Sequence, residues 1–313
     1  MKYIILPLFL FFLGGCGLIS PPEKKHNKTP IILVSIAPYK KLLKEIAHNK
    51  VDVISVIPPD IDPHNWEPTY RDVADLQEAL AWFTIGERFE NRLLEKLEKV
   101  GSKLEAVSLA NVALKEFHGP LPETKVNLFY TDAHHGHHHA LDTHFWLDPL
   151  LMIAQARAVR DTLSDLFPKE AAFFTENFLK LKEKLTNLDN AQQLDLAFCK
   201  GKILTTSHGA YTYYCFRYGL YQLTIEPFSG KEPRAKEISV LTEEMRKKQP
   251  DLLAIIIQPQ HTNKAAKILA HELSLPLFVV DPYGEDYEET ISSLTQALLL
   301  ARAHEKTSLT TTR

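Results

Sequence analysis

"KEAAFFTENFLKLKEKLTNLDNAQQLDLAF" spans residues 169–198 and decides how this chain is organised. Its apolar side chains recur at alternating spacings of four and three residues, which is the period of one helix face. They are Phe174, Phe178, Leu181, Leu185 and Leu188. The segment contains neither glycine nor proline, so no residue in it interrupts a helix. At 1.5 Å per residue, a helix of this span is roughly 40 Å long or more. Such a length is unusual within one domain and favours a connector between two lobes.

Short apolar runs alternate with helical periodicity in the residues before this segment. The strand-like runs are "IILVSIAP" (31–38), "VDVISVIPP" (51–59), "AWFTIG" (81–86) and "EAVSLA" (105–110). The helical stretches are "YKKLLKEIAHN" (39–49), "TYRDVADLQEAL" (69–80), "RFENRLLEKLEKV" (88–100) and "LDPLLMIAQARAVRDTLSDLF" (147–167), which stops at Pro168. Strand, helix and strand at this spacing are typical of a parallel sheet.

The same alternation restarts after residue 198. Strand-like runs are "KILTTS" (202–207), "LTIEPFS" (223–229), "LLAIIIQ" (252–258) and "LFVVDP" (277–282), with helical stretches after each and a last helix at 287–305. Residues 306–313 are predicted to be a frayed tail. We therefore predict an α/β fold with two lobes, each a four-stranded parallel sheet flanked by helices, joined by one long connecting helix. The N-terminal lobe covers 30–168, with a His-rich loop at about 118–143; the connecting helix covers 169–198 and the C-terminal lobe 199–313.

The N-terminus has the pattern of an export signal. Lys2 precedes an apolar run at 3–13, and "LGGC" ends at Cys16. Eleven apolar residues are too few to span a bilayer, which needs about 20. Residues 1–15 therefore read as a signal peptide, and Cys16, directly after small residues, resembles the lipidated cysteine of a bacterial lipoprotein. A short buried strand with an incidental cysteine is the alternative. Residues 16–29 then form the anchor and a flexible tether, and we expect an exported, periplasmic or cell-surface protein that is lipid-anchored to a bacterial membrane.

Composition argues against a nucleic-acid partner, and cysteine content leaves one possible disulfide undecided. The 313 residues are 45% hydrophobic and 24% charged, with a formal net charge of -3. No domain-sized stretch has the clustered Lys and Arg that phosphate binding needs, so we expect no nucleic-acid partner. Cys199 and Cys215 could pair in an oxidising compartment, but their spacing does not show whether they do.

Four side chains capable of binding a metal follow predicted strands or precede a helix. Ligands of open α/β sheets collect at the carboxyl ends of strands. The four are His64, His144, His208 and Asp281, two from each lobe. Each alone has an ordinary explanation as a turn or helix-start residue. Together, three imidazoles and one carboxylate suit a tetrahedral zinc site.

A histidine run lies just before His144. It comprises His134, His135, His137, His138 and His139, in the middle of the chain, so it is not a terminal tag. The run has no periodic apolar face and reads as a loop. Two interpretations remain open: a solvated spacer, or a weak collector or sensor that serves the metal site.

Four motifs give the sequence a recognisable family likeness. They are "DPHNWEPTYRDV" (62–73), "THFWLDP" (143–149), "SHGAYTYYCFRYGL" (207–220) and "VVDPYG" (279–284). In order and spacing the chain resembles the metal-binding solute-binding proteins of ABC transporters, the zinc and manganese uptake family. The resemblance implies that His64, His144, His208 and Asp281 bind the metal. It also implies a non-enzymatic protein, expected to be a monomer, that passes metal to a membrane permease with a cytoplasmic ATPase.

The nitrogen-rich ligand set favours Zn²⁺ as the bound and transported ion, with Mn²⁺ or Fe²⁺ as alternatives. Three residues depart from the family pattern: Thr143, Gly209 and Gln258. A zinc hydrolase is disfavoured because four protein ligands leave no open position and no H-E-x-x-H is present. A surface adhesin or metal sink remains the other alternative.

The remaining candidates receive structural interpretations. Glu67 is predicted to make a structural hydrogen bond, and Trp66, Phe145 and Trp146 to pack beside the ligands. Four further histidines are predicted to face solvent: His118, His261, His271 and His304.

Overall fold

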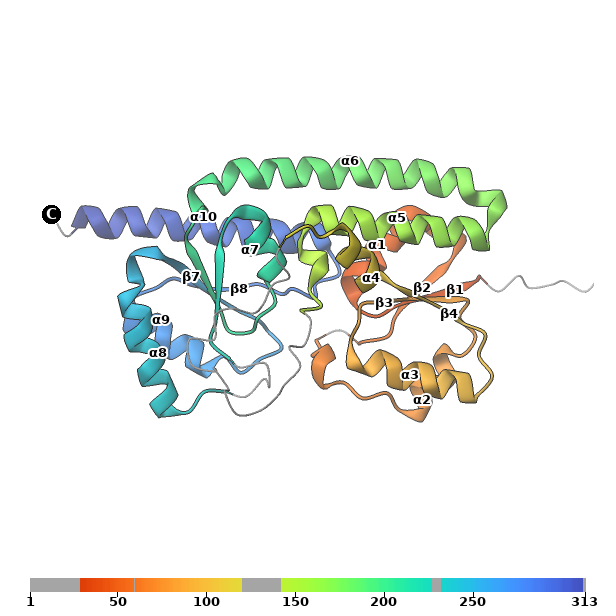
Figure 1. The fold of residues 1–313 in the computed structure, drawn as a ribbon, viewed down its shortest axis with the longest axis horizontal. Helices are drawn as coiled ribbons and strands as arrows, with labels where there is room; N and C mark the ends of the chain where they lie inside the picture. The colour runs from red at the N-terminus through yellow and green to blue at the C-terminus, as the bar shows by residue number, and fades with distance from the viewer. Residues whose placement is uncertain (1–28, 59, 120–141, 227–231, 312–313) are drawn as a thin grey trace, which may run out of the picture.

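The computed structural model describes residues 29–58, 60–119, 142–226 and 232–311, which form two lobes side by side (Figure 1). The proposed signal peptide, Cys16 and most of the tether lie outside the described residues, as do the five histidines at 134–139. Within the described residues, no helix is both long and apolar enough to cross a membrane.

The N-terminal lobe is built on a four-stranded parallel sheet in the order β2-β1-β3-β4. Its strands are β1 (Ile31–Val34), β2 (Asp52–Ser55), β3 (Ala81–Thr84) and β4 (Glu105–Ser108). Its helices are α1 (Ala37–Ala47), α2 (Tyr70–Leu76), α3 (Arg88–Lys99), α4 (Leu109–Glu116) and α5 (Pro149–Leu166). Helices α2 and α3 cover one face of the sheet, and α1 and α5 cover the other (Figure 1). Helix α4, which packs on α5, was not predicted: its first two residues belong to the run at 105–110 that was assigned to a strand, and it ends before the predicted loop begins.

The C-terminal lobe repeats this strand order as β6-β5-β7-β8, again all parallel. Its strands are β5 (Ile203–Thr206), β6 (Tyr221–Thr224), β7 (Leu252–Ile257) and β8 (Leu277–Val279). Its helices are α7 (Thr212–Tyr218), α8 (Ala235–Lys247), α9 (Lys264–Leu273) and α10 (Tyr287–Thr311). The predicted α/β fold of two four-stranded parallel lobes is therefore confirmed. The predicted frayed tail is wrong, because α10 continues to Thr311 where no glycine or proline stops it.

Short 3-10 turns connect several of these elements and prove important at the site. They lie at His48–Lys50, Pro63–Asn65, Phe145–Leu147, Pro168–Glu170, Ala197–Cys199 and Gln249–Asp251. Glycine has a defined role at one helix end: Gly219, with φ 73°, is the left-handed residue that ends α7.

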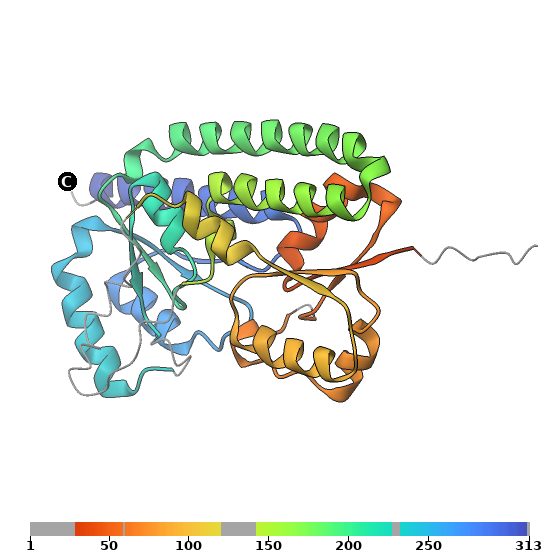
Figure 2. The ribbon, with the colours of Figure 1, turned by 45° about the vertical axis from the view of Figure 1, so that its right-hand side comes forward.

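The connecting helix α6 spans Ala171–Asp195, 25 residues that make a rod about 37 Å long. It lies across both lobes, above α5 and α10 (Figures 1 and 2). At the N-terminal lobe, Asn177 Nδ2 donates to the Ile46 carbonyl over 3.0 Å. At the C-terminal lobe, Asp189 accepts hydrogen bonds from Arg217 and Tyr218 of α7. The helix is thus fastened to both lobes by buried polar contacts as well as by its apolar face.

One continuous hydrophobic core crosses from lobe to lobe. It includes Trp82 from the first sheet, Phe178 and Leu185 from α6, and Tyr214 and Ile256 from the second lobe. Separating the lobes widely would expose this apolar surface to water, which is unfavourable. Small movements of loops at the strand ends therefore cost less free energy than separating the lobes, as a way to open a site between them.

Both C-terminal cysteines are free and buried in this structure. Burial raises the pKa of Cys199 to about 12, despite the nearby positive charges of Arg302 and Lys202. Burial likewise raises the pKa of Cys215. Of the two interpretations left open by the sequence, the structure shows two buried thiols.

Candidate metal centre

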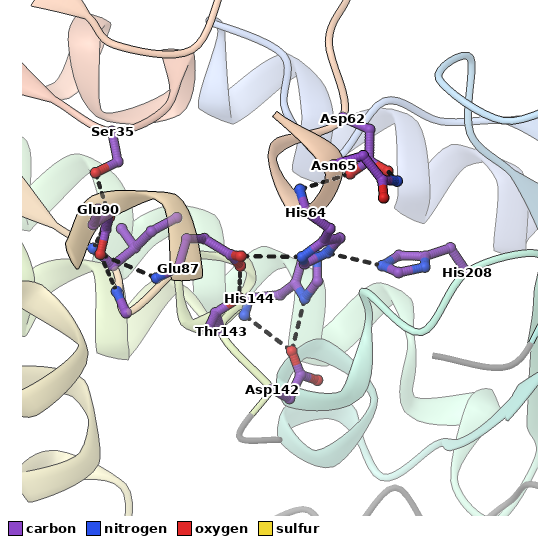
Figure 3. A network of polar contacts seen from close by, with 12 residues as sticks. Ser35, Asp62, His64, Asn65, Glu87, Glu90, Asp142, Thr143, His144 and His208 are labelled. Carbon is purple, nitrogen blue, oxygen red and sulfur yellow. Dashed lines mark hydrogen bonds and ion pairs between the residues drawn. The ribbon is translucent and has the colours of Figure 1, made fainter. Parts of the chain in front are cut away.

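Three of the predicted metal-binding side chains meet between the lobes (Figure 3). His64 lies in the 3-10 turn after β2, His144 immediately precedes the turn at Phe145–Leu147, and His208 follows β5 by two residues. One ring nitrogen from each lies within 4.8 Å of the other two. His64 is the solvent-exposed member of the group, whereas His144 and His208 are buried.

The inward nitrogens are close enough to share one ion. His208 Nε2 lies 3.2 Å from His64 Nε2. The hydroxyl of Tyr283 lies 3.0 Å from His144 Nε2 and 3.4 Å from His64 Nε2. Tyr283 comes from "DPYG" after β8 and was not singled out in the sequence. The centre of the site is therefore surrounded by three imidazole nitrogens and one phenol oxygen.

Asp281 is placed beside this centre but not in it. Its Oδ1 accepts hydrogen bonds from Gln260 Nε2 and from the Tyr283 amide, each over 2.9 Å. It does not belong to the group of side chains whose ligand atoms lie within 4.8 Å of one another. The structure thus brings three of the four predicted residues together, and a ligand role for Asp281 stays a prediction.

Carboxylates hold the outer nitrogens of two of the imidazoles. His64 Nδ1 lies 3.1 Å from Glu87 Oε2, and His144 Nδ1 lies 2.7 Å from Asp142 Oδ1. A carboxylate at Nδ1 favours the tautomer that carries its proton there, which leaves the lone pair of Nε2 free for a metal. The same Asp142 oxygen also accepts from the His144 amide over 3.0 Å, so it fixes both backbone and ring.

The turn after β3 explains how Glu87 reaches His64. Gly86 has φ 90°, a conformation that favours glycine, and turns the chain back toward the site. Glu90 clamps this turn by accepting the amides of Ile85, Gly86 and Glu87 over 2.7, 2.8 and 3.0 Å. Burial raises the pKa of Glu90 to about 7, although these amide hydrogen bonds oppose the shift.

Thr143, one of the departures from the family pattern, completes this arrangement. Its hydroxyl donates a hydrogen bond to Glu87 Oε1, while Oε2 of the same carboxylate faces His64.

Sequence reasoning missed Glu87 and Asp142 as parts of the site. Glu87 follows β3 at the same sheet edge that pointed to His64, so the strand-end argument would have found it.

The electrostatic environments of the three imidazoles differ. Burial opposes a proton on His64, but the hydrogen bond and charge of Glu87 outweigh it and raise the pKa of His64 above 6.5. Burial also opposes ionisation of Glu87, yet the His64 and Thr143 contacts lower its pKa. The pKa of His208 is well below 6.5, because of burial and of repulsion by His144, His64 and His261. Burial and its neighbours therefore favour the neutral form of the His208 imidazole.

His261 was predicted to face solvent, and that prediction is wrong, because its side chain is largely enclosed by neighbouring residues. Only 9% of its side chain is exposed. Its ring stacks on His208 with centroids 5.0 Å apart, and its Nδ1 lies 3.3 Å from buried Glu226. Asn263, in a left-handed conformation, donates to the carbonyls of Gln258 and His261 and folds this loop inward. The other three, His118, His271 and His304, are exposed as predicted.

The aromatic predictions are confirmed in part. Trp146 packs beside His144 with ring centroids 5.0 Å apart, and its Nε1 donates to the Pro282 carbonyl over 2.9 Å. Trp66 packs on Phe89, and Phe145 packs on Tyr213, rather than on a ligand. Glu67 makes the predicted structural contact, accepting a hydrogen bond from Arg92.

The fold and this site define a class of protein. Two parallel α/β lobes joined by one helix, with imidazoles converging between their strand ends, are the architecture of a metal-binding solute-binding protein. The homologues of this chain are solute-binding proteins of ABC transporters, not enzymes. The family described as "Zinc-uptake complex component A periplasmic" matches residues 32–301, and this chain belongs to it. Membership places the protein outside the cytoplasm and implies a permease and an ATPase as partners.

Individual relatives are similar to most of this chain. A Chlamydia muridarum protein whose name describes it as metal-binding is 26% identical over 297 residues, covering 95% of this chain and 99% of the relative. The zinc-binding lipoprotein AdcA of Streptococcus pneumoniae is 28% identical over 92% of this chain, which spans only 56% of that relative's length. The crystal structure of ZnuA superposes with a TM-score of 0.74 at 25% identity, covering 87% of this chain and 98% of that one.

Proposed function

We propose that this protein captures Zn²⁺ between its lobes with His64, His144 and His208 and delivers it to a membrane permease. The observation that carries the proposal is the convergence of three imidazole nitrogens within 4.8 Å. Two of those rings are braced by carboxylates at Nδ1, as ligating histidines commonly are. The name of the pneumococcal relative, which describes a zinc-binding lipoprotein, supports the same metal.

The choice of Zn²⁺ over Mn²⁺ or Fe²⁺ rests on the donor atoms. Three neutral nitrogens suit zinc, whereas manganese favours carboxylate, carbonyl and water oxygens. Asp281 remains the fourth ligand that the family resemblance predicts. Its carboxylate would have to move toward the imidazoles to bind the same ion, because it now accepts hydrogen bonds from Gln260 and the Tyr283 amide.

The proposal also covers attachment and the accessory loop. Residues 1–15 would be removed, Cys16 would carry the lipid, and residues 16–29 would tether a monomeric binding protein to the membrane. The histidines at 134–139 would collect metal weakly without forming the tight site. The proposal gives tight binding to His64, His144 and His208 and weak binding to the histidine run, because the three converging imidazoles lie outside residues 134–139.

Metal competition on the purified mature protein tests this function. We expect Zn²⁺ to displace Mn²⁺ and Fe²⁺ from one tight site. A variant lacking residues 133–139 should keep that affinity and lose only weaker binding, because the deleted histidines are not among the three that converge. Titration calorimetry with a competing chelator measures both. Tighter binding of Mn²⁺ than of Zn²⁺ would contradict the choice of metal, and loss of the tight site on deletion would contradict the division of roles.

The acid sensitivity of zinc binding is expected to depend on Glu87. Protons compete with the metal for His64, whose pKa is raised above 6.5 by Glu87, so affinity should begin to fall above that pH as the solution is acidified. Glu87→Gln removes the negative charge and lowers the pKa of His64, so the acid-induced loss should begin at a lower pH. Where the imidazoles are neutral, the variant should bind Zn²⁺ roughly 10- to 100-fold more weakly.

Zinc titrations across a pH series measure both effects. Glu67→Gln is the matched control, because Glu67 is an exposed carboxylate that contacts Arg92 rather than a histidine. Identical pH profiles for the two variants would show that Glu87 does not act on His64.

A further inference from the structure

The His208 imidazole is held differently from the other two imidazoles of the proposed site. Carboxylates contact the Nδ1 atoms of His64 and His144. In the part of the chain that the structure describes, no carboxylate contacts the His208 ring. The rings beside it are those of His64, His144 and His261. The first two converge with His208 on the proposed ion, so His261 is the neighbouring ring that can orient His208 from outside the site.

Three adjacent strand ends bring His261 and a carboxylate next to His208. The C-terminal sheet has the order β6-β5-β7, so β5 lies between the other two strands. Glu226 follows β6, His208 follows β5 and His261 follows β7. The Glu226 amide donates to the Ser207 carbonyl, and the Ser207 amide donates to the Ile256 carbonyl, each over 2.9 Å. These backbone hydrogen bonds fix the chain segments on both sides of the one that carries His208.

The His261 side chain is itself held in one place. It is 9% exposed, and its Nδ1 lies 3.3 Å from Oε2 of Glu226, whose side chain is 3% exposed. This contact is a close approach rather than a well-aligned hydrogen bond. The His261 amide donates to the Gln258 carbonyl over 3.3 Å, and Asn263 Nδ2 donates to the His261 carbonyl over 2.6 Å. The ring and the backbone of His261 are thus both fixed by neighbouring residues.

The contact between the rings of His208 and His261 is nearly parallel. Their planes differ by 17° and their centroids lie 5.0 Å apart, as in an offset stack. By contrast, the His208 ring is tilted by 46° to His64 and by 65° to His144. A stack covers one face of a ring and leaves its edge open. His208 Nε2 therefore remains directed at the centre of the site, 3.2 Å from His64 Nε2, while rotation of the ring is restricted.

We propose that His261, held by Glu226, is a positioning residue that keeps the His208 imidazole directed at the metal ion. The stack does for His208 what carboxylates at Nδ1 do for the other two imidazoles. The inference rests on the proposed metal-binding function and leaves its ligands unchanged. Without the stack, the His208 ring adopts more orientations in the metal-free protein, and the cost of ordering it weakens metal binding.

His261→Ala and His261→Phe test whether the stacked ring is what matters. Alanine removes the ring, so we expect Zn²⁺ to bind roughly 10-fold more weakly, as when residues that orient a ligand are replaced. Phenylalanine keeps a flat ring beside His208 and should recover most of this loss. Competition with a chelator measures both affinities, in a form lacking residues 133–139. Thermal unfolding of the metal-free variants shows that they are folded, and exposed His271→Ala is the matched control.

A double variant tests whether His261 acts through His208. Since the expected effect passes through the His208 ring, adding His261→Ala to His208→Ala should cause no further loss of affinity. Two merely independent effects would instead add.

Three results would each overturn the inference: unchanged affinity of His261→Ala, equal losses for His261→Ala and His261→Phe, or additive losses in the double variant. Each leaves the proposed function standing as long as His208→Ala alone loses tight binding. Tight binding retained by His208→Ala would contradict the proposed function itself.

Discussion

His208→Ala is expected to weaken zinc binding by about 100-fold or more. Structural zinc sites bind with about 10 to 16 kcal/mol, so one of four ligands accounts for roughly 3 kcal/mol, and each 1.4 kcal/mol is about tenfold in affinity. His208 is a suitable target because its low pKa keeps it neutral, and its Nε2 lies 3.2 Å from that of His64. Competition with a chelator of known affinity measures the change.

The matched control for this experiment is His271→Ala. His271 lies on α9 in the same lobe, and its side chain is 89% exposed. Its replacement should leave zinc affinity unchanged. Both variants should also be compared in a form lacking residues 133–139, so that weak binding by the histidine run does not mask the loss. Equal affinities for His208→Ala and His271→Ala would show that the converging imidazoles do not hold the metal.

Asp189→Ala is expected to lower the free energy of unfolding by about 3 kcal/mol, as removal of one partner from a buried ion pair does. Asp189 lies on α6 with its side chain 4% exposed and accepts from Arg217 Nε and Nη2 over 2.9 and 2.5 Å. It also accepts from Tyr218 over 3.1 Å. The lower end of the usual range applies because Arg217 keeps partial contact with water. Denaturant unfolding in the presence of a chelator measures the change.

A surface pair on the same helix provides the control. Glu176 contacts Lys180 one turn away, with side chains 67% and 68% exposed. Glu176→Ala should produce no measurable change in unfolding, because exposed pairs are well screened by water. Zinc affinity of the folded Asp189→Ala variant should be unaltered. Equal stabilities for the two variants would show that the Asp189 contacts do not fasten α6 to the second lobe.

Local patterns in the sequence were sufficient for the architecture. Apolar runs of strand length alternate with helical periodicity twice, on either side of one long uninterrupted helix. Those patterns reflect the separate periods of strand and helix, and each needs only neighbouring residues to be recognised. The same reasoning located His64, His144 and His208, because parallel strands bring their carboxyl ends to one sheet edge.

The details of the site depended on contacts between distant segments. His144 meets Tyr283 across 139 residues, and His208 meets His64 across 144. Which side chain of "VVDPYG" enters the centre is decided by Trp146 and Gln260, which hold Pro282 and Asp281 from other parts of the chain. The burial of His261 likewise depends on the fold, since Glu226 and His208 come from other strand ends.

The sequence by itself therefore determined the two parallel lobes, their long connector and the three imidazoles between them. Only the tertiary structure decided that Glu87 and Asp142 hydrogen-bond to the Nδ1 atoms of two of those imidazoles. It likewise decided that the Tyr283 hydroxyl, rather than the Asp281 carboxylate, contacts the imidazoles. The physical reason is that strand ends can be located from periodicity, whereas the direction of a side chain in a loop is set by hydrogen bonds and packing from distant segments.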